Sequence, residues 1–281
     1  MKIIRNIKEM SGFSKKQQIK GKTIGFVPTM GALHEGHLSL IRQAHKENDI
    51  VVVSIFINPI QFGPKEDYRR YPRNLRLDTQ LCRREGTDVI FCPHAQQMYP
   101  GNYKTYVNVS DLSDVLCGKF RPGHFKGVAT VVTKLFNIVA PDIAYFGGKD
   151  AQQAIIIKKL AYDLNIPIRI KVMPTVCERD GLAMSSRNAY LNKEERLDAA
   201  SLHQALILAK NLIKRGDTDS ADIIRKMRRL INKKKSACIQ YISIVKHKDL
   251  EPLDKIRGKV LIALSVWIGK TRLIDNIIVN C

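Results

Sequence analysis

Residues 26–37 read Phe-Val-Pro-Thr-Met-Gly-Ala-Leu-His-Glu-Gly-His, which predicts a strand, a turn and the beginning of a helix. The β-prone residues 23–27 favour the strand, and Pro28 and Gly31 end it. Apolar residues recur at helical spacing from Leu38 onward. This order places His34 and His37 at the N-terminal end of a helix, just beyond the carboxyl end of a strand.

That position suits an anionic ligand. Ligands of open α/β sheets bind beyond the carboxyl ends of the strands, and a helix N-terminus attracts anions. The two imidazoles can also donate hydrogen bonds to phosphate oxygens. His-x-x-His pairs occur in metal sites as well, but no third ligand stands at a diagnostic spacing. Taken alone, the pair is equally compatible with ordinary loop histidines.

Strand-like and helical patterns alternate up to residue 176, which predicts a parallel α/β sheet. The expected strands span 23–27, 50–57, 88–91, 143–146 and 168–173, and the expected helices span 37–46, 74–85, 127–139 and 151–164. Beyond residue 177 we expect helices over 193–214 and 220–232, then β-prone segments over 239–245, 259–266 and 273–279. The fold class is therefore α/β. A Rossmann-like parallel-sheet domain over 1–176 precedes a smaller α+β C-terminal domain over 177–281.

Composition points to a globular chain with a large core. The chain has 281 residues, of which 44% are hydrophobic, and no apolar run is long enough to span a bilayer. The six cysteines are widely spread without a C-x-x-C pair, which suits reduced thiols, and the N-terminus lacks a signal-peptide pattern. We therefore expect a cytoplasmic location. The net charge of +21 is spread over both halves, which favours a solvated basic surface over a nucleic-acid site.

Two further clusters carry side chains suited to polar ligands. Residues 54–62 read Ser-Ile-Phe-Ile-Asn-Pro-Ile-Gln-Phe, a buried-type strand that runs into an Asn-Pro turn. Gln61 would lie at the carboxyl edge of the sheet, where it could bind a hydroxyl or carboxylate, or merely cap backbone. Residues 121–127 read Arg-Pro-Gly-His-Phe-Lys-Gly. This loop before a helix is typical of an anion pocket, a mobile lid or a plain surface turn.

Two more clusters suit a nucleotide. Residues 145–153 read Tyr-Phe-Gly-Gly-Lys-Asp-Ala-Gln-Gln, in which a diglycine turn lets backbone approach a ligand and Lys149 offers a point charge to phosphate. The spacing is not that of a Walker A loop. Residues 184–188 read Met-Ser-Ser-Arg-Asn, whose hydroxyls and arginine can bind a triphosphate, although a capped turn explains them equally. Together, the clusters predict an enzyme that activates an acceptor by attack on the α-phosphate of ATP.

These motifs resemble the pantothenate synthetase (pantoate–β-alanine ligase) family of the nucleotidyltransferase superfamily, which includes class I aminoacyl-tRNA synthetases. His-x-x-His alone would indicate only the superfamily, whereas Asn-Pro-x-Gln-Phe with Met-Ser-Ser-Arg-Asn is specific to the family. The motifs occur in the family's order and cover nearly the whole chain. One departure is Gly148, where the family commonly has glutamate. The family also does not require the strong positive charge.

The resemblance implies ATP-dependent condensation of (R)-pantoate with β-alanine, giving pantothenate, AMP and pyrophosphate through pantoyl-adenylate, a step of coenzyme A biosynthesis. It implies that His37, the usual proton donor, acts with His34, Lys149 and Arg187 as the catalytic group. The implied ATP-binding residues are Met30, Gly31, Ala32, Leu33, His34, Glu35, Gly36, His37, Gly147, Gly148, Lys149, Asp150, Val176, Met184, Ser185, Ser186 and Arg187. The implied pantoate residues are Gln61, which also borders β-alanine, and Gln153. Tyr71, Arg121 and His124 are further candidates near the closing loop.

The resemblance also implies Mg²⁺ as the cofactor of ATP, with no direct protein cage for a metal, and a homodimer. It implies that the C-terminal domain closes over the ATP phosphates. Two alternatives remain at this stage. An adenylyltransferase acting on a phosphate acceptor would need a basic acceptor pocket, whereas Gln61 suits a neutral hydroxy-acid. A nucleic-acid-binding protein would explain the charge, but no recognised nucleic-acid module is present.

Overall fold

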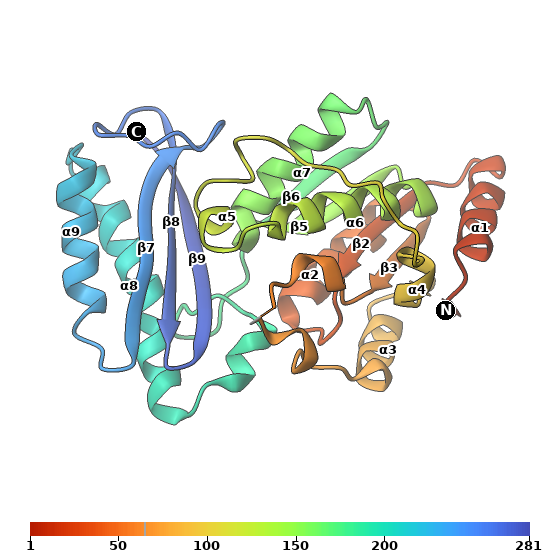
Figure 1. The fold of residues 1–281 in the computed structure, drawn as a ribbon, viewed down its shortest axis with the longest axis horizontal. Helices are drawn as coiled ribbons and strands as arrows, with labels where there is room; N and C mark the ends of the chain where they lie inside the picture. The colour runs from red at the N-terminus through yellow and green to blue at the C-terminus, as the bar shows by residue number, and fades with distance from the viewer. Residues whose placement is uncertain (65) are drawn as a thin grey trace. The chain divides into compact units, whose positions relative to one another are not determined.

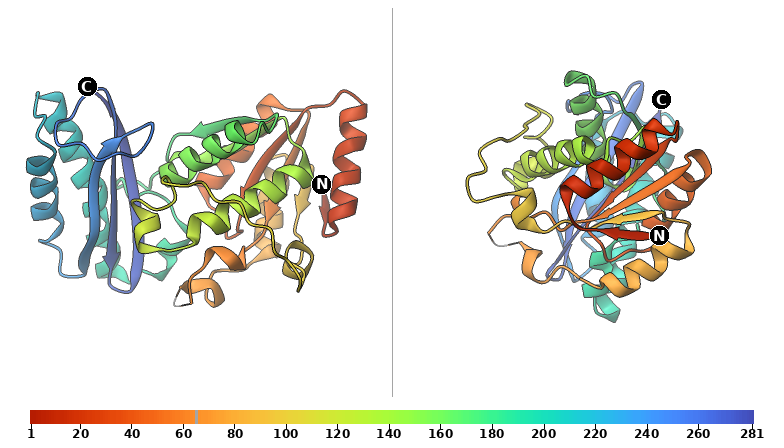
Figure 2. Two further views of the ribbon diagram at one scale, coloured as in Figure 1. Left: turned by 45° about the horizontal axis from the view of Figure 1, so that its top comes forward. Right: turned by 90° about the vertical axis from the view of Figure 1, so that its right-hand side faces the viewer.

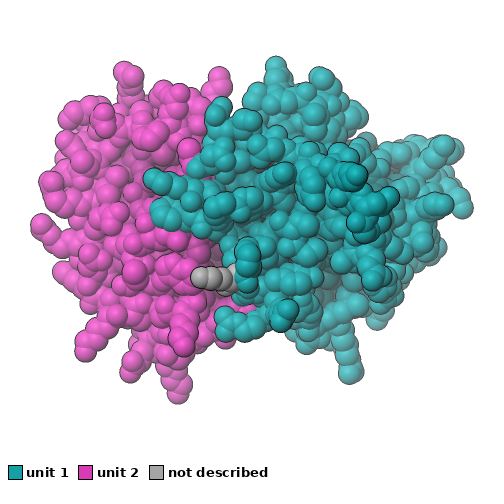
Figure 3. Space-filling model, in the orientation of Figure 1, with its two compact units in different colours: residues 1–114, 118–148, 153–174 teal, residues 115–117, 149–152, 175–281 magenta. Residues whose placement is uncertain are grey.

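The structure is a computed structural model that describes residues 1–64 and 66–281. The described chain divides into two compact units (Figure 3). Unit 1 comprises residues 1–114, 118–148 and 153–174, and unit 2 comprises residues 115–117, 149–152 and 175–281. The two short segments 115–117 and 149–152, which the sequence placed in the first domain, therefore pack with the C-terminal part of the chain.

Within the described residues, unit 1 contains a six-stranded parallel sheet with the strand order β1-β4-β3-β2-β5-β6 (Figure 1). The strands are β1 (Lys2–Ile4), β2 (Ile24–Thr29), β3 (Ile50–Ile55), β4 (Val89–Phe91), β5 (Ile143–Gly147) and β6 (Arg169–Met173). The chain runs from β2 toward β3 on one side, and β5 pairs with β2 on the other. The strand order therefore changes direction at β2, and ligands of such sheets bind at this point.

The helices of unit 1 cover both faces of the sheet (Figure 2). α1 packs with α6 and against β2, whereas α2 packs with α3 and against β2, β3 and β5. The helices are α1 (Ile7–Ile19), α2 (Glu35–Glu47), α3 (Leu75–Arg84), α4 (Ala95–Met98), α6 (His124–Val139) and α7 (Ala151–Asp163), with η1 (Pro59–Gln61) and η2 (Asp67–Arg69) as short 3₁₀ turns. α5 (Cys117–Phe120), η3 (Gly148–Asp150) and α7 each cross the division between the units, since residues 151 and 152 of α7 belong to unit 2.

The core of the sheet consists of apolar residues whose side chains are fully buried. Val51, Val52 and Val53 of β3 and Phe26 of β2 have no solvent exposure. Such continuous apolar strands are typical of a parallel sheet covered on both faces. This burial is the physical reason why the strand positions could be predicted from the sequence.

Unit 2 contains an antiparallel sheet with the order β7-β8-β9, covered by two helices. The strands are β7 (Ala237–Lys246), β8 (Lys259–Ile268) and β9 (Thr271–Asn280), and the helices are α8 (Lys193–Lys214) and α9 (Ser220–Ile231), preceded by the 3₁₀ turn η4 (Ser186–Tyr190). Asp219 caps α9, since its side chain accepts from the backbone N–H of Asp222. The expected fold class, a Rossmann-like sheet followed by a smaller α+β unit, is confirmed.

The structure differs from the sequence-based expectations at several element ends. β3 stops at Ile55 rather than residue 57, and α2 begins at Glu35 because His34 is its N-cap. α6 begins at His124, so this histidine belongs to a helix rather than to the preceding loop. β1 and α1 were not predicted, because β1 is short and the only buried side chains of α1 are Met10 and Ser14.

Candidate active site

His34 and His37 lie at the start of α2, directly after the turn that follows β2. The two rings lie 4.1 Å apart between centroids, and both side chains are partly exposed. The backbone N–H of Gly36 donates to Nδ1 of His34 at 3.2 Å, and the backbone N–H of His34 donates to Nδ1 of His37 at 3.4 Å. The sequence-based prediction of a histidine pair at a helix N-terminus is therefore confirmed in its geometry.

These hydrogen bonds decide which ring nitrogen carries the proton. A nitrogen that accepts from a backbone N–H is unprotonated, so each neutral ring carries its hydrogen on Nε2. Both imidazoles can then donate from Nε2–H, while each Nδ1 accepts a backbone N–H at the N-terminus of α2. This is the tautomer that a phosphate-binding pair requires.

The turn between β2 and α2 is held by a residue that the sequence did not single out. Asp78 of α3 has 2% exposure, and its two carboxylate oxygens accept from the backbone N–H groups of Ala32 at 3.0 Å and Leu33 at 2.8 Å. Burial raises the pKa of Asp78 above its usual value, against the lowering effect of these bonds. Gly31 and Ala32 have positive φ values of 80° and 51°, so the turn needs this support.

We expect Asp78→Ala to lower the free energy of unfolding by about 3 kcal/mol, because a buried and a partly buried backbone N–H group lose their carboxylate acceptor. Catalytic activity should fall as well, since the turn leads directly into His34. Thermal and urea unfolding would measure the change. The matched control is Gln80→Ala, an exposed position on the same helix. An unchanged midpoint in Asp78→Ala would contradict the role of this carboxylate.

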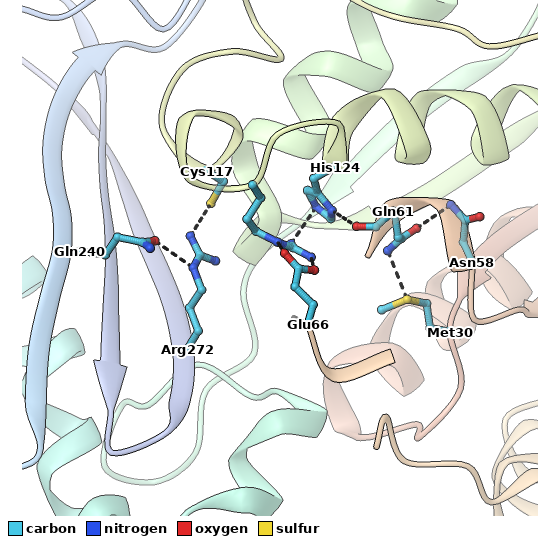
Figure 4. A network of polar contacts seen from close by, with 9 residues as sticks. Met30, Asn58, Gln61, Glu66, Cys117, His124, Gln240 and Arg272 are labelled. Carbon is cyan, nitrogen blue, oxygen red and sulfur yellow. Dashed lines mark hydrogen bonds and ion pairs between the residues drawn. The ribbon is translucent and has the colours of Figure 1, made fainter. Parts of the chain in front are cut away.

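Gln61 lies at the end of η1, which follows β3, and its side chain is buried with 9% exposure. Its Nε2 donates to the sulfur of Met30 at 3.3 Å, and its Oε1 accepts from Nδ2 of Asn58 at 3.0 Å (Figure 4). Gly127 of α6 packs so closely that an added Cβ would lie 2.6 Å from the carbonyl oxygen of Ile60. The backbone of η1 is therefore fixed by close contact with α6.

The main chain of Gln61 is held by a second set of contacts. His124 Nδ1 lies 2.8 Å from the Gln61 carbonyl oxygen, which can only accept, and Arg121 Nη1 lies 3.0 Å from His124 Nε2 (Figure 4). Arg121 Nε also donates to Glu66 at 2.7 Å. Burial acts to raise the pKa of Glu66, but the hydrogen bonds and charge of Arg121 outweigh it and lower that pKa. Tyr71 is buried nearby, with its ring 6.1 Å from that of Phe62. The further candidates Tyr71, Arg121 and His124 therefore support the loop that contains Gln61.

The loop after Gln61 borders a cavity of about 430 Å³. Its lining combines aromatic, acidic and basic side chains and consists of Pro59, Phe62, Gly63, Pro64, Glu66, Tyr68, Arg69 and Arg70.

In unit 2, the turn that carries Lys149 is held by the C-terminal sheet. Asn276 of β9 donates from Nδ2 to the Lys149 carbonyl oxygen at 2.7 Å. Gln152 is buried, accepts from the Cys117 backbone N–H at 3.0 Å and donates to the Val115 carbonyl at 2.7 Å. These bonds explain why residues 115–117 and 149–152 pack with the C-terminal unit. The sequence contained no signal for them, because the partners lie far apart along the chain.

Cys117 is also tied to the sheet of unit 2 by its thiol. Its sulfur lies 3.1 Å from the Tyr241 hydroxyl and 3.5 Å from Nη2 of Arg272, and Arg272 Nε donates to Gln240 at 2.9 Å (Figure 4). Burial raises the pKa of Tyr241 far above its ordinary value, with a further contribution from Cys117. The hydroxyl therefore stays protonated, and the contact is a structural one.

A buried carboxyl group interacts electrostatically with the lysine of this turn. Asp275 of β9 is 4% exposed, and burial raises its pKa to about 6, partly offset by the backbone N–H of Asn276 and the charge of Lys149. Asp275 therefore changes its charge in a range where ordinary aspartates are already ionised. This residue was not predicted, since the sequence shows only a single acidic position within a strand.

Val176 and residues 184–187 of unit 2, which the resemblance assigns to ATP binding, lie close together along the chain's fold. The backbone N–H of Met184 donates to the Val176 carbonyl at 3.0 Å, so these two residues are adjacent. Ser185 is the N-cap of η4, its hydroxyl accepting from the backbone N–H of Arg187 at 3.3 Å. Asn188 donates to Glu178 at 2.8 Å and anchors the turn. The Met-Ser-Ser-Arg-Asn motif therefore forms a capped turn whose members stay partly exposed.

The remaining predicted residues are placed as follows. Gly147 ends β5 and Gly148 opens η3, while Gln153 lies partly exposed in the first turn of α7. Nothing lies within 4 Å of a Cβ added at Gly147, so the backbone there is open to a ligand. Glu35 pairs with Arg42 of the same helix, so its carboxylate is turned to that partner.

Across residues 1–64 and 66–281, no group of three or more His, Cys, Asp or Glu side chains is arranged to hold a metal ion. Over the same residues, none of the helices combines the length and the apolar character needed to cross a membrane.

Comparison with known proteins gives a consistent result. A family profile described as pantoate-beta-alanine ligase matches residues 2–278. A pantothenate synthetase of Caldicellulosiruptor bescii is 55% identical over 280 residues, covering 100% of this chain and 99% of that protein. One of Fervidobacterium nodosum is 54% identical over 281 residues and covers 100% of both.

Solved structures agree with the sequence comparison. A pantothenate synthetase structure from Thermus thermophilus superposes with a TM-score of 0.94 at 40% identity, covering 99% of both chains. A pantoate-beta-alanine ligase from Francisella tularensis, described as complexed with beta-gamma ATP and beta-alanine, gives a TM-score of 0.81 at 38% identity over 99% of this chain and 97% of that one. The chain therefore belongs to the pantoate–β-alanine ligase family.

Proposed function

We propose that this ligase works in two steps through pantoyl-adenylate. The carboxylate of (R)-pantoate attacks the α-phosphate of ATP, and pyrophosphate leaves. The amine of β-alanine then attacks the acyl carbon of the adenylate, loses a proton, and AMP leaves with pantothenate as the product. No covalent enzyme intermediate is needed, because binding energy positions the reacting groups and excludes water from the adenylate.

The proposal rests above all on the 3.3 Å contact between Gln61 Nε2 and the sulfur of Met30. Gln61 is the residue proposed for pantoate, and Met30 belongs to the turn proposed for ATP. The contact brings an acid-binding amide next to the nucleotide turn at the carboxyl edge of the unit 1 sheet. This is the arrangement that attack of a carboxylate on an ATP phosphate requires.

The roles of the other residues follow from their chemistry. We propose that His34 and His37 donate from Nε2 to ATP phosphates, with His37 as the proton donor. Lys149 and Arg187 neutralise phosphate charge, where transition-state stabilisation is greatest. The hydroxyls of Ser185 and Ser186 bind the same phosphates, Gln153 binds pantoate with Gln61, and Gln61 also borders β-alanine. The remaining nucleotide contacts are assigned to residues 30–33, 35–36, 147–148, 150, 176 and 184.

Mg²⁺ is proposed to enter with ATP. Mg²⁺ retains several waters and binds mainly through substrate phosphates rather than through a protein cage. Bound there, it would neutralise phosphate charge. The family resemblance further supports a homodimer and a cytoplasmic location as proposals.

The direct test is ATP–pyrophosphate exchange with purified protein, Mg²⁺ and a panel of acids, in the absence of β-alanine. We expect exchange only with (R)-pantoate, because adenylate formation needs no amine. Addition of β-alanine should then convert exchange into net formation of AMP. Exchange without pantoate, or only with a phosphorylated acceptor, would contradict the proposal and indicate another adenylyltransferase. Exchange with no acid, together with salt-dependent binding of RNA or DNA, would favour the nucleic-acid alternative.

A further inference from the structure

Tyr99 lies outside every group of residues proposed above, yet its hydroxyl reaches the Gln61 loop. It directly follows α4, and its ring lies 5.1 Å from that of Tyr103 and 6.3 Å from that of Phe56 between centroids. The hydroxyl donates to Oδ1 of Asn58 at 2.9 Å. Burial raises the pKa of Tyr99 well above the ordinary tyrosine value, so the hydroxyl remains a donor across the pH range of enzyme assays.

The orientation of the Asn58 amide follows from its partners. The Gly127 carbonyl oxygen can only accept, and it lies 3.0 Å from Nδ2 of Asn58. The nitrogen of the amide must therefore face Gly127, which turns Oδ1 toward the Tyr99 hydroxyl. Asn58 is 1% exposed, so bulk solvent cannot replace either partner. The nitrogen and the oxygen of this amide cannot exchange places without leaving a buried polar atom unpaired.

The same logic extends to Gln61. Nδ2 of Asn58 also donates to Oε1 of Gln61 at 3.0 Å, so the Gln61 oxygen is committed to Asn58 (Figure 4). Nε2 of Gln61 consequently points the other way, toward the sulfur of Met30. A thioether is a weak acceptor, so this buried amide donor gains when a ligand oxygen replaces the sulfur as its partner. Gln61 is therefore oriented to donate a hydrogen bond to its ligand.

We propose that Tyr99 is a positioning residue that acts through Asn58 to hold the Gln61 amide as a hydrogen-bond donor to an oxygen of pantoate. The inference rests on the proposed role of Gln61 in pantoate binding. It adds Tyr99 to the residues that serve this role, and it specifies that the Gln61 amide donates to pantoate rather than accepts from it. Tyr99 does not touch the substrate. Its hydroxyl occupies Oδ1 of Asn58, which leaves Nδ2 as the group that faces Gln61.

The test is Tyr99→Phe, which keeps the ring and removes only the hydroxyl. Asn58 then has a buried oxygen without a donor, and only the Gly127 carbonyl oxygen still favours the orientation in which Nδ2 faces Gln61. We expect the KM for pantoate in ATP–pyrophosphate exchange to rise about tenfold, while the KM for ATP stays within about twofold. The matched control is Tyr103→Phe, a neighbouring ring of the same stack, for which both KM values should stay unchanged. An unchanged KM for pantoate in Tyr99→Phe would overturn the proposal.

A double-mutant cycle separates positioning from a general structural effect. In a Gln61→Ala background, Tyr99→Phe should raise the KM for pantoate no further, because the amide it orients is gone. The same tenfold rise in both backgrounds would overturn the proposal, since Tyr99 would then act independently of Gln61. If Gln61→Ala alone leaves the KM for pantoate unchanged, the assignment of Gln61 to pantoate fails, and the role of Tyr99 fails with it. Pantoate-dependent exchange by the wild-type enzyme would still support the reaction itself, so the two failures are distinguishable.

Discussion

His37→Ala should lower the rate of pantoate-dependent ATP–pyrophosphate exchange by about 100- to 10,000-fold, the range expected for a group that transfers a proton in the transition state. The physical reason lies in its tautomer. Nδ1 of His37 accepts from the His34 backbone N–H at 3.4 Å, so Nε2 carries the hydrogen that a phosphate oxygen can accept. Single-turnover measurements of adenylate formation would report this step without interference from the amine.

A second variant separates hydrogen bonding from proton transfer. His37→Gln keeps an N–H donor close to the position of Nε2 but cannot act as an acid. If His37 donates a proton, this variant should recover ATP affinity and leave the rate low. The matched control is His45→Ala, an exposed histidine in the last turn of the same helix, which should keep the wild-type rate. A rate close to wild type in His37→Ala would contradict the assignment of the proton donor.

Gln61→Glu should impair pantoate use more than Gln61→Ala, although it changes the shape of the side chain far less. Removing the amide in Gln61→Ala deletes a buried hydrogen bond to a charged acid, which corresponds to a loss of about 100-fold in the kcat/KM for pantoate. Gln61→Glu retains an oxygen that can accept from Asn58, but it presents a second acceptor where the amide presented a donor. Repulsion between two carboxylates adds several kcal/mol, so we expect a loss above about 1,000-fold.

The pH dependence of this loss provides its internal check. Protonation of the introduced carboxyl restores a donor, so the activity of Gln61→Glu relative to wild type should rise as the pH falls toward the pKa of that group. ATP binding, measured by calorimetry without pantoate, should be unchanged in both variants. Equal losses in Gln61→Glu and Gln61→Ala would show that the polarity of the amide does not matter. Normal pantoate turnover in Gln61→Ala would remove Gln61 from the pantoate site.

Much of the fold could be predicted because its main signals are local. Buried parallel strands such as β3 read as continuous apolar runs, and helices such as α8 show regular apolar spacing with a capping residue at the start. The histidine pair could be placed for the same reason, since Pro28 and Gly31 mark the end of the strand within a few residues of it. The α/β order, the three β-prone segments near the C-terminus and the helix N-terminus beside the first turn all follow from such short-range patterns.

The supporting contacts could not be predicted, because each joins residues that are distant along the chain. Asp78 on α3 holds the turn before His34, and a single aspartate in this amphipathic helix gives no sign that it is buried. Asn276 and Gln152 fix the Lys149 turn from segments that the sequence assigns to different domains. Only the packing of helices and strands decides which distant polar groups meet.

The sequence alone therefore supplied the candidate residues for ATP and pantoate, because those residues lie in short recognisable motifs. The tertiary structure decided how these residues are oriented. The carbonyl of Gly127 and the hydroxyl of Tyr99 set the amide of Asn58, and Asn58 in turn sets the amide of Gln61. An amide side chain can face either way in an isolated segment. Its polarity becomes definite only when burial removes water and leaves one arrangement in which every donor has an acceptor.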